Sequence, residues 1–511
     1  MTQSINENML EVLLSKVEQV RSWSPRVMSK LENFIRSAED DELFRVNPIE
    51  WAESKGVAEP EAIDLFLHSA KTGLFNMDWI VICPCCGMIM HSLSHLHNMQ
   101  PRHTCTICTR DDIATLDNYV QVVFTLPPAV RELRYHHPES LAMDDYLFKY
   151  VLSRNARYFV GGTNMTFSQM FPLMSKHFGT VSRGDRVTVE TKLGPMGVLV
   201  TNRLADLSGV VLIGLGDETA TEPQKVVFRL TASGFETDLP MIDPNKIIYG
   251  QVVLRGALYA VKPGPITLEI EQASSGDEGL FVWQSEVPSP DKFDPEMVNF
   301  TPSLTAKRLF ACQTFHDLFR SEVFQESQGF SVKDVTILFT DLKSSTQLYN
   351  QIGDLNAFAL VREHYGVLNK AILNNHGAVV KTIGDAIMAT FNQPQDAVSA
   401  GLDMLDGLRE MNAASQHGDL ELKVGIHRGA AISVTLNERI DYFGQTINTA
   451  ARVQGSAGGG EIYITSDIYA EPDVPALLSQ HPLEVAPMQI ELKGIEEPVK
   501  VYRITGANRA V

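Results

Sequence analysis

The chain has 511 residues, and at about 150 residues per domain this length suggests roughly three domains. Its 43 Lys and Arg residues and 62 Asp and Glu residues give a formal charge of −19. A chain this acidic is poorly suited to a phosphate backbone or an anionic membrane surface. Apolar residues make up 44% and charged residues 21%, a globular composition that excludes wholesale disorder. We therefore expect a folded protein with no nucleic-acid partner.

No apolar run approaches the length of about 18 residues that spans a bilayer; the longest is residues 209–215. The N-terminal apolar patch, residues 9–14, contains Glu11 and lacks the basic start of a secretory signal. We expect no membrane span and a cytoplasmic protein.

Residues 1–80 are expected to be helical. Leu10, Leu13, Leu14 and Val17 recur at helical spacing, and a second helical unit over residues 47–67 is broken by a turn at Gly56. A helix, a glycine turn and a helix loosely resemble a winged-helix unit. Plain helical packing is the preferred interpretation, since the charge disfavours DNA or RNA binding.

A cysteine cluster marks residues 81–110. Two Cys-x2-Cys pairs, separated by residues 87–104, have the spacing of a tetrahedral four-thiolate zinc ribbon with one structural Zn²⁺. The predicted ligands are Cys83, Cys86, Cys105 and Cys108. Cys85 is an alternative to Cys83 or Cys86, and the nearby His91, His95, His97 and His103 are expected on a solvated loop. The isolated Cys312 is expected in a core.

The middle of the chain changes pattern twice. Residues 111–185 are mixed α/β, and residues 186–286 alternate apolar and polar positions in short runs, as in Val226, Phe228 and Leu230. Such strands predict a β-sandwich-like domain. Residues 287–330 are predicted to form a proline-rich linker followed by a helix from Ser303 to about Phe324.

In the last segment, residues 331–511, carboxylates follow predicted strands. Asp341 ends the apolar strand 335–340 and precedes a Ser/Thr-rich helix start that includes Thr346. Backbone N–H groups at such a start bind phosphate oxygens, while the carboxylate holds a divalent cation. Asp385 lies at the tip of a hairpin formed by residues 378–391. Two carboxylates on adjacent strands suggest a pair of Mg²⁺ or Mn²⁺ ions, although Gly-Asp alone more commonly marks a turn.

A third cluster spans residues 441–452. Asn448 and Arg452 are four residues apart and therefore share one face of a helix. Taken alone, such a pair is more commonly a surface amide and a surface guanidinium.

Together these motifs resemble the catalytic set of the class III nucleotidyl cyclases: Asp341 in Phe-Thr-Asp-Leu, Lys381-Thr-Ile-Gly-Asp385, Asp441-Tyr-Phe-Gly-x-x-x-Asn448-x-x-x-Arg452 and Leu492-Lys493-Gly494. The resemblance covers residues 331–511 and implies a ferredoxin-like α/β catalytic domain within a multidomain α+β chain. Residues 45–330 also resemble the uncharacterised N-terminal region of some bacterial soluble cyclases.

The resemblance implies a role for each motif residue. Asp341 and Asp385 would bind two Mg²⁺ or Mn²⁺ ions, with the Leu342 carbonyl as a further ligand. Lys381 and Asp441 would read the purine edge. The remaining roles are Asn448 on the ribose, Arg452 on the α-phosphate, and Lys493 and Thr346 on the other phosphates.

Lys donates to adenine N1 and Asp accepts from the 6-amino group, whereas guanylate-forming relatives usually carry Glu and Cys there. The resemblance thus favours an adenylate cyclase that forms cyclic AMP and pyrophosphate from ATP. It also implies a homodimer, because the metal and purine residues come from opposite protomers in this family.

No general base is evident, and His427 and Arg428 receive no role. The alternatives are a guanylate cyclase, a catalytically weak nucleotide-binding module, and a nucleic-acid-binding protein, which the charge disfavours. The regulator of the N-terminal region is unknown.

Overall fold

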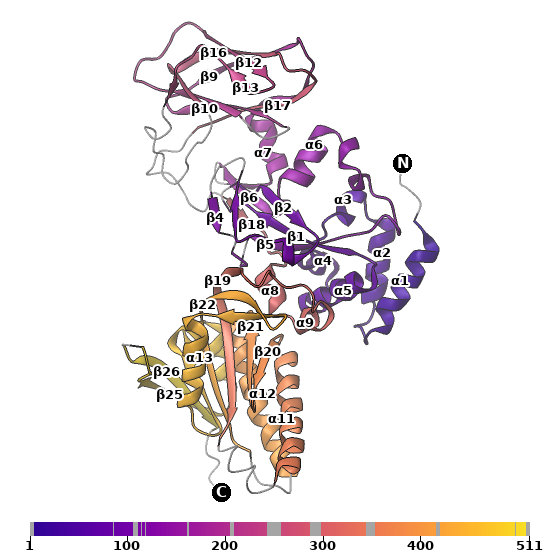
Figure 1. The fold of residues 1–511 in the computed structure, drawn as a ribbon, viewed down its shortest axis with the longest axis vertical. Coiled ribbons are helices and arrows are strands. Elements are labelled where there is room, and N and C mark those ends of the chain that lie inside the picture. Colours follow the sequence, from indigo (N-terminus) through magenta and orange to yellow (C-terminus); the bar gives the residue numbers. More distant parts are fainter. Residues whose placement is uncertain are drawn as a thin grey trace.

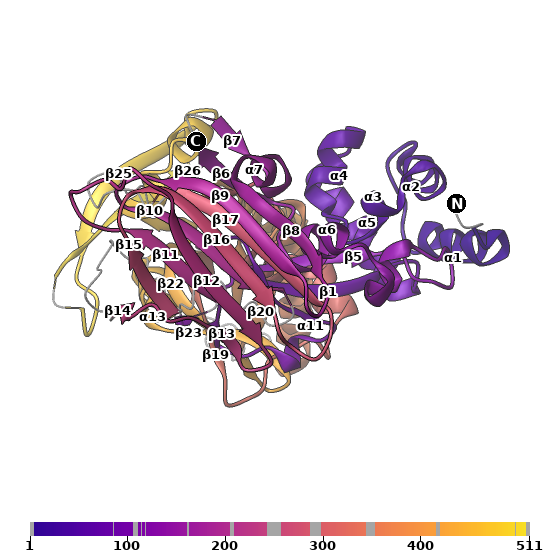
Figure 2. The ribbon, with the colours of Figure 1, turned by 90° about the horizontal axis from the view of Figure 1, so that it is seen from above.

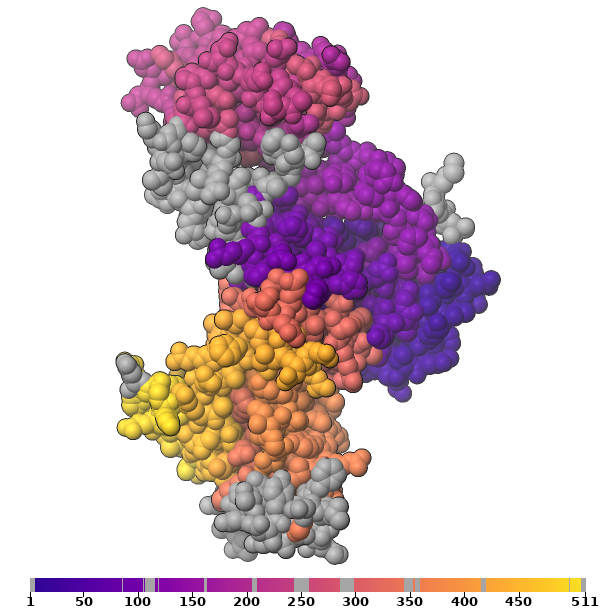
Figure 3. Space-filling view, in the orientation of Figure 1, coloured from indigo at the N-terminus to yellow at the C-terminus, as the bar shows by residue number. Residues whose placement is uncertain are grey.

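The computed structural model describes residues 5–84, 86–105, 111–113, 115–117, 119–160, 163–204, 209–242, 257–286, 298–343, 353–414, 420–495 and 497–506. Three bodies follow one another along the long axis (Figure 1). We call them the two-sheet body (residues 175–286), the N-terminal body (residues 5–174) and the C-terminal body (residues 329–506). A connecting segment, residues 301–328, lies between the last two (Figure 3).

The N-terminal body begins with helices that pack one apolar face inward. In the first, the Asn6 side chain accepts a hydrogen bond from Met9 N, which caps the helix, while Leu10, Leu13 and Val17 are buried. The helices are α1 (Glu7–Gln19), α2 (Val27–Ser37), α3 (Asp40–Leu43), α4 (Pro48–Lys55) and α5 (Glu59–Thr72). Helix α4 ends at Gly56, whose positive φ of 57° suits glycine. The winged-helix likeness stays a prediction.

A three-stranded antiparallel sheet of order β2-β1-β5 follows these helices. Its strands are β1 (Asn76–Ile82), β2 (Ile89–Leu93) and β5 (Val120–Thr125). A strand pair, β3 (Arg102–Thr104) and β4 (Asp111–Ile113), lies between β2 and β5 in sequence. The body is completed by short elements: α6 (Met143–Tyr146), β6 (Ala156–Val160), β7 (Thr163–Met165), α7 (Phe167–Met174) and β18 (Val298–Phe300).

The two-sheet body places the inner residues of both sheets in one core. Alternate residues point inward, as in Val187 and Val189 of one sheet and Leu280 and Val282 of the other. Seen from above, the strands of both sheets lie along nearly the same axis (Figure 2). One sheet has the order β14-β15-β11-β10-β17-β8 and the other β13-β12-β16-β9. The strands are β8 (Ser175–Val181), β9 (Arg186–Leu193), β10 (Gly197–Arg203), β11 (Gly209–Gly214), β12 (Gln224–Thr231), β13 (Gly234–Glu236), β14 (Met241–Ile242), β15 (Ala257–Val261), β16 (Gly264–Gln272) and β17 (Glu278–Glu286).

The C-terminal body is a sheet of order β20-β21-β19-β22-β24-β26-β25, with β23 paired to β22. Its strands are β19 (Gly329–Leu342), β20 (Ala378–Ile383), β21 (Ala386–Phe391), β22 (Leu422–Leu436), β23 (Arg439–Phe443), β24 (Glu461–Thr465), β25 (Leu483–Ile490) and β26 (Val499–Gly506). Its helices are α11 (Asp354–Asn374), α12 (Pro394–Ala414), α13 (Gln445–Ser456), α14 (Ser466–Tyr469) and α15 (Asp473–Leu478).

The two faces of this sheet belong to different cores. On β19, Leu338 and Leu342 pack into the core of α11 and α12, whereas Ile337 and Phe339 face the other way, as the period of two requires. The second core is continuous with that of the N-terminal body through Phe310, Phe315 and Phe324 of the connecting segment. The N-terminal and C-terminal bodies are therefore joined by shared apolar burial.

The connecting segment differs from the single helix predicted over Ser303 to Phe324. It forms two short helices, α8 (Ala306–Phe310) and α9 (Gln313–Leu318), because Cys312 adopts an extended backbone between them. The break lets Phe310 and Phe315 both enter the shared core. The proline-rich part of the predicted linker, residues 287–297, lies outside the described residues. Within the described chain, none of the helices has the length and apolarity needed to cross a lipid bilayer.

Candidate active site

Two aspartates meet at one edge of the C-terminal sheet. Asp341 lies at the end of β19, and Asp385 lies in the turn between β20 and β21. The β19–β21 register pairs Phe339 with Met388, and Ile387 N donates to Thr340 Oγ1 at 3.0 Å. Continuing this register places Asp341 beside the turn. Gly384 has a φ of 63°, so glycine allows the tight return that brings Asp385 to this edge.

The electrostatics of this pair suit a cation. Burial raises the pKa of Asp341, and the charge of Asp385 raises it further, while Lys423 acts in the opposite direction. Asp385 Oδ2 is buried without a hydrogen-bond partner among the described residues. Adjacent carboxylates with an unsatisfied buried oxygen fit the oxygen-ligand preference of Mg²⁺ or Mn²⁺. Leu342, named as a carbonyl ligand, follows Asp341 and buries its side chain in the helix-side core.

His364 on α11 is a neighbour that the sequence motifs did not indicate. Its side chain is fully buried, and both ring nitrogens lack a hydrogen-bond partner among the described residues. Burial lowers its pKa to about 4, with the charge of Asp385 opposing the shift. The imidazole is therefore neutral at pH 7 and adds no positive charge beside the aspartates. In the sequence, only the position of His364 on the apolar face of a helix indicated that its side chain is buried.

Lys381 and Asp441, the predicted purine-reading pair, are brought into direct contact. Lys381 on β20 places its Nζ 2.6 Å from Asp441 Oδ2 on β23. Asp441 Oδ1 accepts from Tyr442 N at 2.7 Å, which fixes the carboxylate's orientation. The Asp441 side chain is 10% exposed and the Lys381 side chain 36% exposed, so the carboxylate is largely buried while the ammonium side chain is partly open to solvent.

Within one chain, the described residues show no direct bond between these two pairs. No hydrogen bond or ion pair of the described residues joins Asp341 or Asp385 to Lys381 or Asp441. Lys381 precedes Asp385 by four residues, which is up to about 13 Å along an extended strand.

Helix α13 carries Asn448 and Arg452 on one side. The helix begins after Gly444, whose φ of 139° favours glycine. A Cβ at Gly425 on β22 would overlap the backbone of Gln454, so glycine allows the helix to pack close to the sheet. Asn448 is exposed and Arg452 half-buried.

The loop of Lys493 approaches the same helix. A Cβ on Gly494 would lie 3.7 Å from both Nη atoms of Arg452, and Lys493 is exposed next to it. The structure thus brings the loop that carries Lys493 beside Arg452. Thr346, the predicted phosphate contact, lies outside the described residues.

Arg428, which received no role from the motifs, pairs with Asp334 and Glu471. Lys307 of the connecting segment lies 3.9 Å from the same Asp334 carboxylate. Through Asp334, these ion pairs link the C-terminal sheet to the connecting segment, so Arg428 has a structural contact.

Three of the predicted zinc ligands converge in the N-terminal body. The Sγ atoms of Cys83, Cys86 and Cys105 all lie within 4.8 Å of one another, and those of Cys86 and Cys105 are 3.6 Å apart. Tetrahedral coordination with Zn–S bonds of about 2.3 Å places sulfur atoms about 3.8 Å apart. Gly87 N donates to Cys83 O at 3.0 Å, and Gly87 has a φ of 71°, as a tight knuckle requires. Cys85 and Cys108 lie outside the described residues.

The histidines of this region do not all lie on a solvated loop. His91, His95 and His97 are exposed, but His103 is buried on β3, and its ring centroid lies 4.7 Å from that of His91 with the two planes tilted by 48°. The expectation was wrong for His103, which lies on β3, pairs through its backbone with β4 and is only 5% exposed. Cys312 is half-buried against the shared core, and burial raises its thiol pKa to about 12.

Comparisons with known proteins divide the chain in two. Residues 328–506 match the family model described as "Adenylate and Guanylate cyclase catalytic domain", and residues 7–199 match a "Family of unknown function (DUF5939)". Among curated relatives, an adenylate cyclase of Anabaena cylindrica is 28% identical over 189 residues, which is 34% of this chain and 37% of the relative. An adenylate cyclase of Lachancea kluyveri is 30% identical over 158 residues, which is 27% of this chain and 8% of the relative. The chain thus spans well under half of either relative.

Two solved structures are each similar to 36% of this chain. The adenylyl cyclase CyaB from P. aeruginosa is 23% identical with a TM-score of 0.31, over 36% of this chain and 99% of the other. The guanylyl cyclase Cya2 is 23% identical with a TM-score of 0.30, over 36% of this chain and 96% of the other.

Proposed function

Residues 328–506 form a domain of the class III nucleotidyl cyclase family, and on that premise we propose that the protein converts ATP to 3′,5′-cyclic AMP and pyrophosphate. The observation that carries the choice of ATP is the Lys381–Asp441 contact of 2.6 Å. Lys presents donors and ionised Asp presents acceptors. Adenine offers the complementary acceptor at N1 and donor at its 6-amino group, so both contacts match.

The aspartate edge would hold two Mg²⁺ or Mn²⁺ ions through Asp341 and Asp385. Two observations support this assignment. Asp385 Oδ2 is buried without a hydrogen-bond partner among the described residues, and the pKa of Asp341 is raised, mainly by burial and further by the charge of Asp385. When bound, such ions acidify the ribose 3′-hydroxyl and neutralise charge on the leaving pyrophosphate.

The remaining side chains position the nucleotide. Asn448 would orient the ribose from the exposed side of α13, and Arg452, one turn later, would stabilise charge on the α-phosphate. Lys493 lies in the loop beside Arg452 and would hold the terminal phosphates. Positioning of this kind, together with electrostatic stabilisation, supplies most of the catalysis in phosphoryl chemistry.

The active form would be a homodimer with two shared sites. The separation of the aspartate edge from the Lys381–Asp441 pair within one chain supports this arrangement. Each site would take its metal ligands from one protomer and its purine contacts from the other.

The N-terminal body would hold one structural Zn²⁺. Cys83, Cys86 and Cys105 fit the sulfur spacing of such a site, and Cys108 would complete it. Four protein ligands leave no open position, so the ion would stabilise the fold. The N-terminal body would then act as a regulatory region, since it shares a core with the catalytic domain.

The test is nucleotide turnover by the purified full chain. ATP and GTP are supplied separately with Mn²⁺, and cyclic AMP and cyclic GMP are separated and quantified. We expect the wild type to form cyclic AMP from ATP. The Asp341→Asn variant should lose this activity. The control variant Asp406→Asn should retain it; the exposed Asp406 carboxylate pairs with Arg409 on α12. Absence of cyclic AMP formation by dimeric, folded protein would contradict the proposal.

A further inference from the structure

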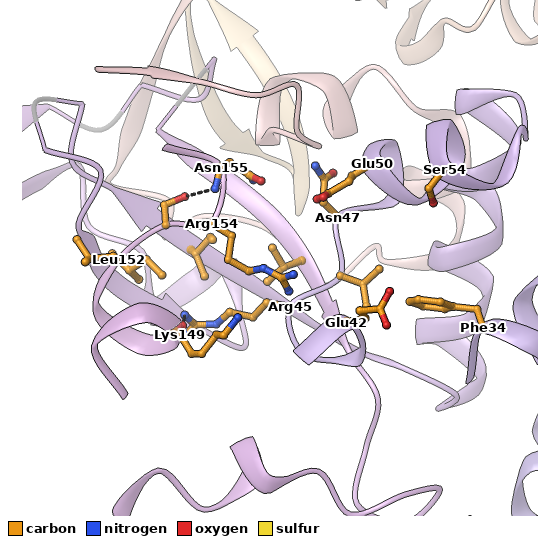
Figure 4. A pocket seen from close by; sticks show the side chains of 15 residues that line it. Phe34, Glu42, Arg45, Asn47, Glu50, Ser54, Lys149, Leu152, Arg154 and Asn155 are labelled. Carbon is orange, nitrogen blue, oxygen red and sulfur yellow. Dashed lines mark hydrogen bonds between the residues drawn. The ribbon is translucent and has the colours of Figure 1, made fainter. Parts of the chain in front are cut away.

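The N-terminal body contains a cavity that lies apart from the candidate active site. Its volume is about 150 Å³, and it opens between α2, α4, the three-stranded sheet and residues 149–155 (Figure 4). Ile80, Ile89, Val123 and Leu152 form an apolar surface within it. Arg45, Lys149 and Arg154 add three cations to the lining.

Arg45 differs from Lys149 and Arg154 in having no ion pair with a carboxylate among the described residues. It is half-buried after α3 and has a φ of 56°. Its Nη1 donates to Lys149 O at 2.8 Å, and its guanidinium stacks 5.2 Å from Phe44 and 5.1 Å from Tyr150. Among the described residues it forms no ion pair with a carboxylate, and burial lowers its pKa. The charge of Asp78 acts on Arg45, but the two side chains form no ion pair among the described residues. A direct charge-assisted contact from the Arg45 guanidinium is therefore left for a bound anion.

The other two cations share one acid. Lys149 and Arg154 both pair with Asp41, and burial, followed by the charge of Arg154, lowers the pKa of Lys149 to about 8. Glu42 and Glu50 also line the cavity but are exposed, and they lie on the opposite side from the cations (Figure 4). The cationic side therefore carries more positive than negative charge.

We propose that this cavity binds a small organic carboxylate, with the anionic group against Arg45 and the carbon skeleton against Ile80, Ile89 and Val123. The cations supply charge-assisted donors that suit a carboxylate, and the apolar surface favours a carbon skeleton over an inorganic ion. An apolar cavity of about 150 Å³ accommodates a molecule of the size of benzene. Benzoate is therefore a suitable probe, and benzamide is its neutral counterpart of the same shape.

Two asparagines connect the cavity to the catalytic domain. Asn47, which lines the cavity, donates from Nδ2 to Pro302 O at 2.9 Å, and Asn155, which also lines it, accepts at its backbone oxygen from Thr301 N at 2.9 Å. Residues 301–305 lead directly into α8 and the shared core. A bound carboxylate that shifts the cavity walls would alter this segment. If the proposed function holds, the ligand would thereby regulate cyclic nucleotide formation.

The first experiment measures binding to the full chain by isothermal titration calorimetry, with benzoate, benzamide and inorganic phosphate as separate probes. Benzoate is expected to bind at least tenfold more tightly than either of the others. Arg45→Gln should weaken benzoate binding at least tenfold, whereas Arg36→Gln, which removes an exposed guanidinium on α2, should leave it unchanged. Equal binding of benzoate and benzamide, or unchanged binding in a folded Arg45→Gln variant, would overturn the proposal. Lys149→Gln serves as a second variant. If both variants misfold, the affinities of the wild type for benzoate, benzamide and phosphate test the proposal.

The second experiment measures amide hydrogen exchange with and without benzoate. Slower exchange at residues 301–305 is the expected result, and benzoate binding with unchanged exchange there would refute the connection. Neither readout depends on turnover. A chain that binds benzoate but forms no cyclic nucleotide would therefore contradict the proposed function and leave the cavity assignment standing.

Discussion

Exchanging the Lys381–Asp441 pair for the Glu and Cys of guanylate-forming relatives should erode the preference for ATP. Guanine presents a donor at N1 and an acceptor at O6. In the wild type, the Lys381 donor would therefore face a donor and the Asp441 acceptor would face an acceptor. The Asp441 side chain is only 10% exposed, and leaving a buried acceptor unpaired costs about 1–3 kcal/mol. The Lys381 side chain is 36% exposed, so partial solvation limits its mismatch to about 1 kcal/mol.

The two costs sum to about 2–4 kcal/mol, which corresponds to a factor of about 30 to about 900 between the nucleotides. We therefore expect the wild-type kcat/KM for ATP to exceed that for GTP by on the order of a hundredfold. The variant Lys381→Glu with Asp441→Cys should reduce this ratio at least tenfold, with some loss of turnover because the 2.6 Å contact is also lost.

The assay measures kcat/KM for both nucleotides under the same Mn²⁺ concentration. The matched control is Lys262→Glu with Glu218→Cys, which alters an exposed 2.8 Å ion pair of the two-sheet body. This control should leave the ratio unchanged. Comparable wild-type kcat/KM for ATP and GTP would show that Lys381 and Asp441 do not read the base as argued.

Four further predictions concern the metals and the dimer. Asp341→Ala or Asp385→Ala should lower kcat more than tenfold, a barrier increase above about 1.4 kcal/mol; smaller losses would contradict the two-metal site. Mn²⁺ affinity should fall as pH falls, because burial and then Asp385 raise the pKa of Asp341 and protons compete with the metal. Inactive Asp341→Ala and Arg452→Ala chains should recover turnover when mixed, and no recovery despite proven subunit exchange would refute shared sites. Purified protein should contain about one zinc per chain by elemental analysis, lost in Cys105→Ser and kept in Cys312→Ser; zinc-free wild type would refute the ribbon.

The local structure of the candidate-site motifs could be predicted from the sequence, because each motif depends on local order. A strand ending at Asp341, a two-residue turn at Gly384-Asp385 and a helix that spaces Asn448 from Arg452 by one turn all follow from periodicity and turn chemistry. The register of β19 with β21 then places the two aspartates at one edge. The contact between Lys381 and Asp441 was implied only by family resemblance, since β20 and β23 are distant in sequence and are not hydrogen-bonded neighbours.

The sequence by itself determined the strand alternation, the turn glycines and the cysteine spacing, because these are set by neighbours a few residues away. Tertiary structure alone decided which long-range partners meet. The break of the predicted helix at Cys312, the burial of His364 and His103, and the cavity around Arg45 all depend on packing between segments far apart in the chain. Apolar periodicity shows that a face is buried but not what covers it, so the core shared by the N-terminal body and the catalytic sheet was visible only in the folded molecule.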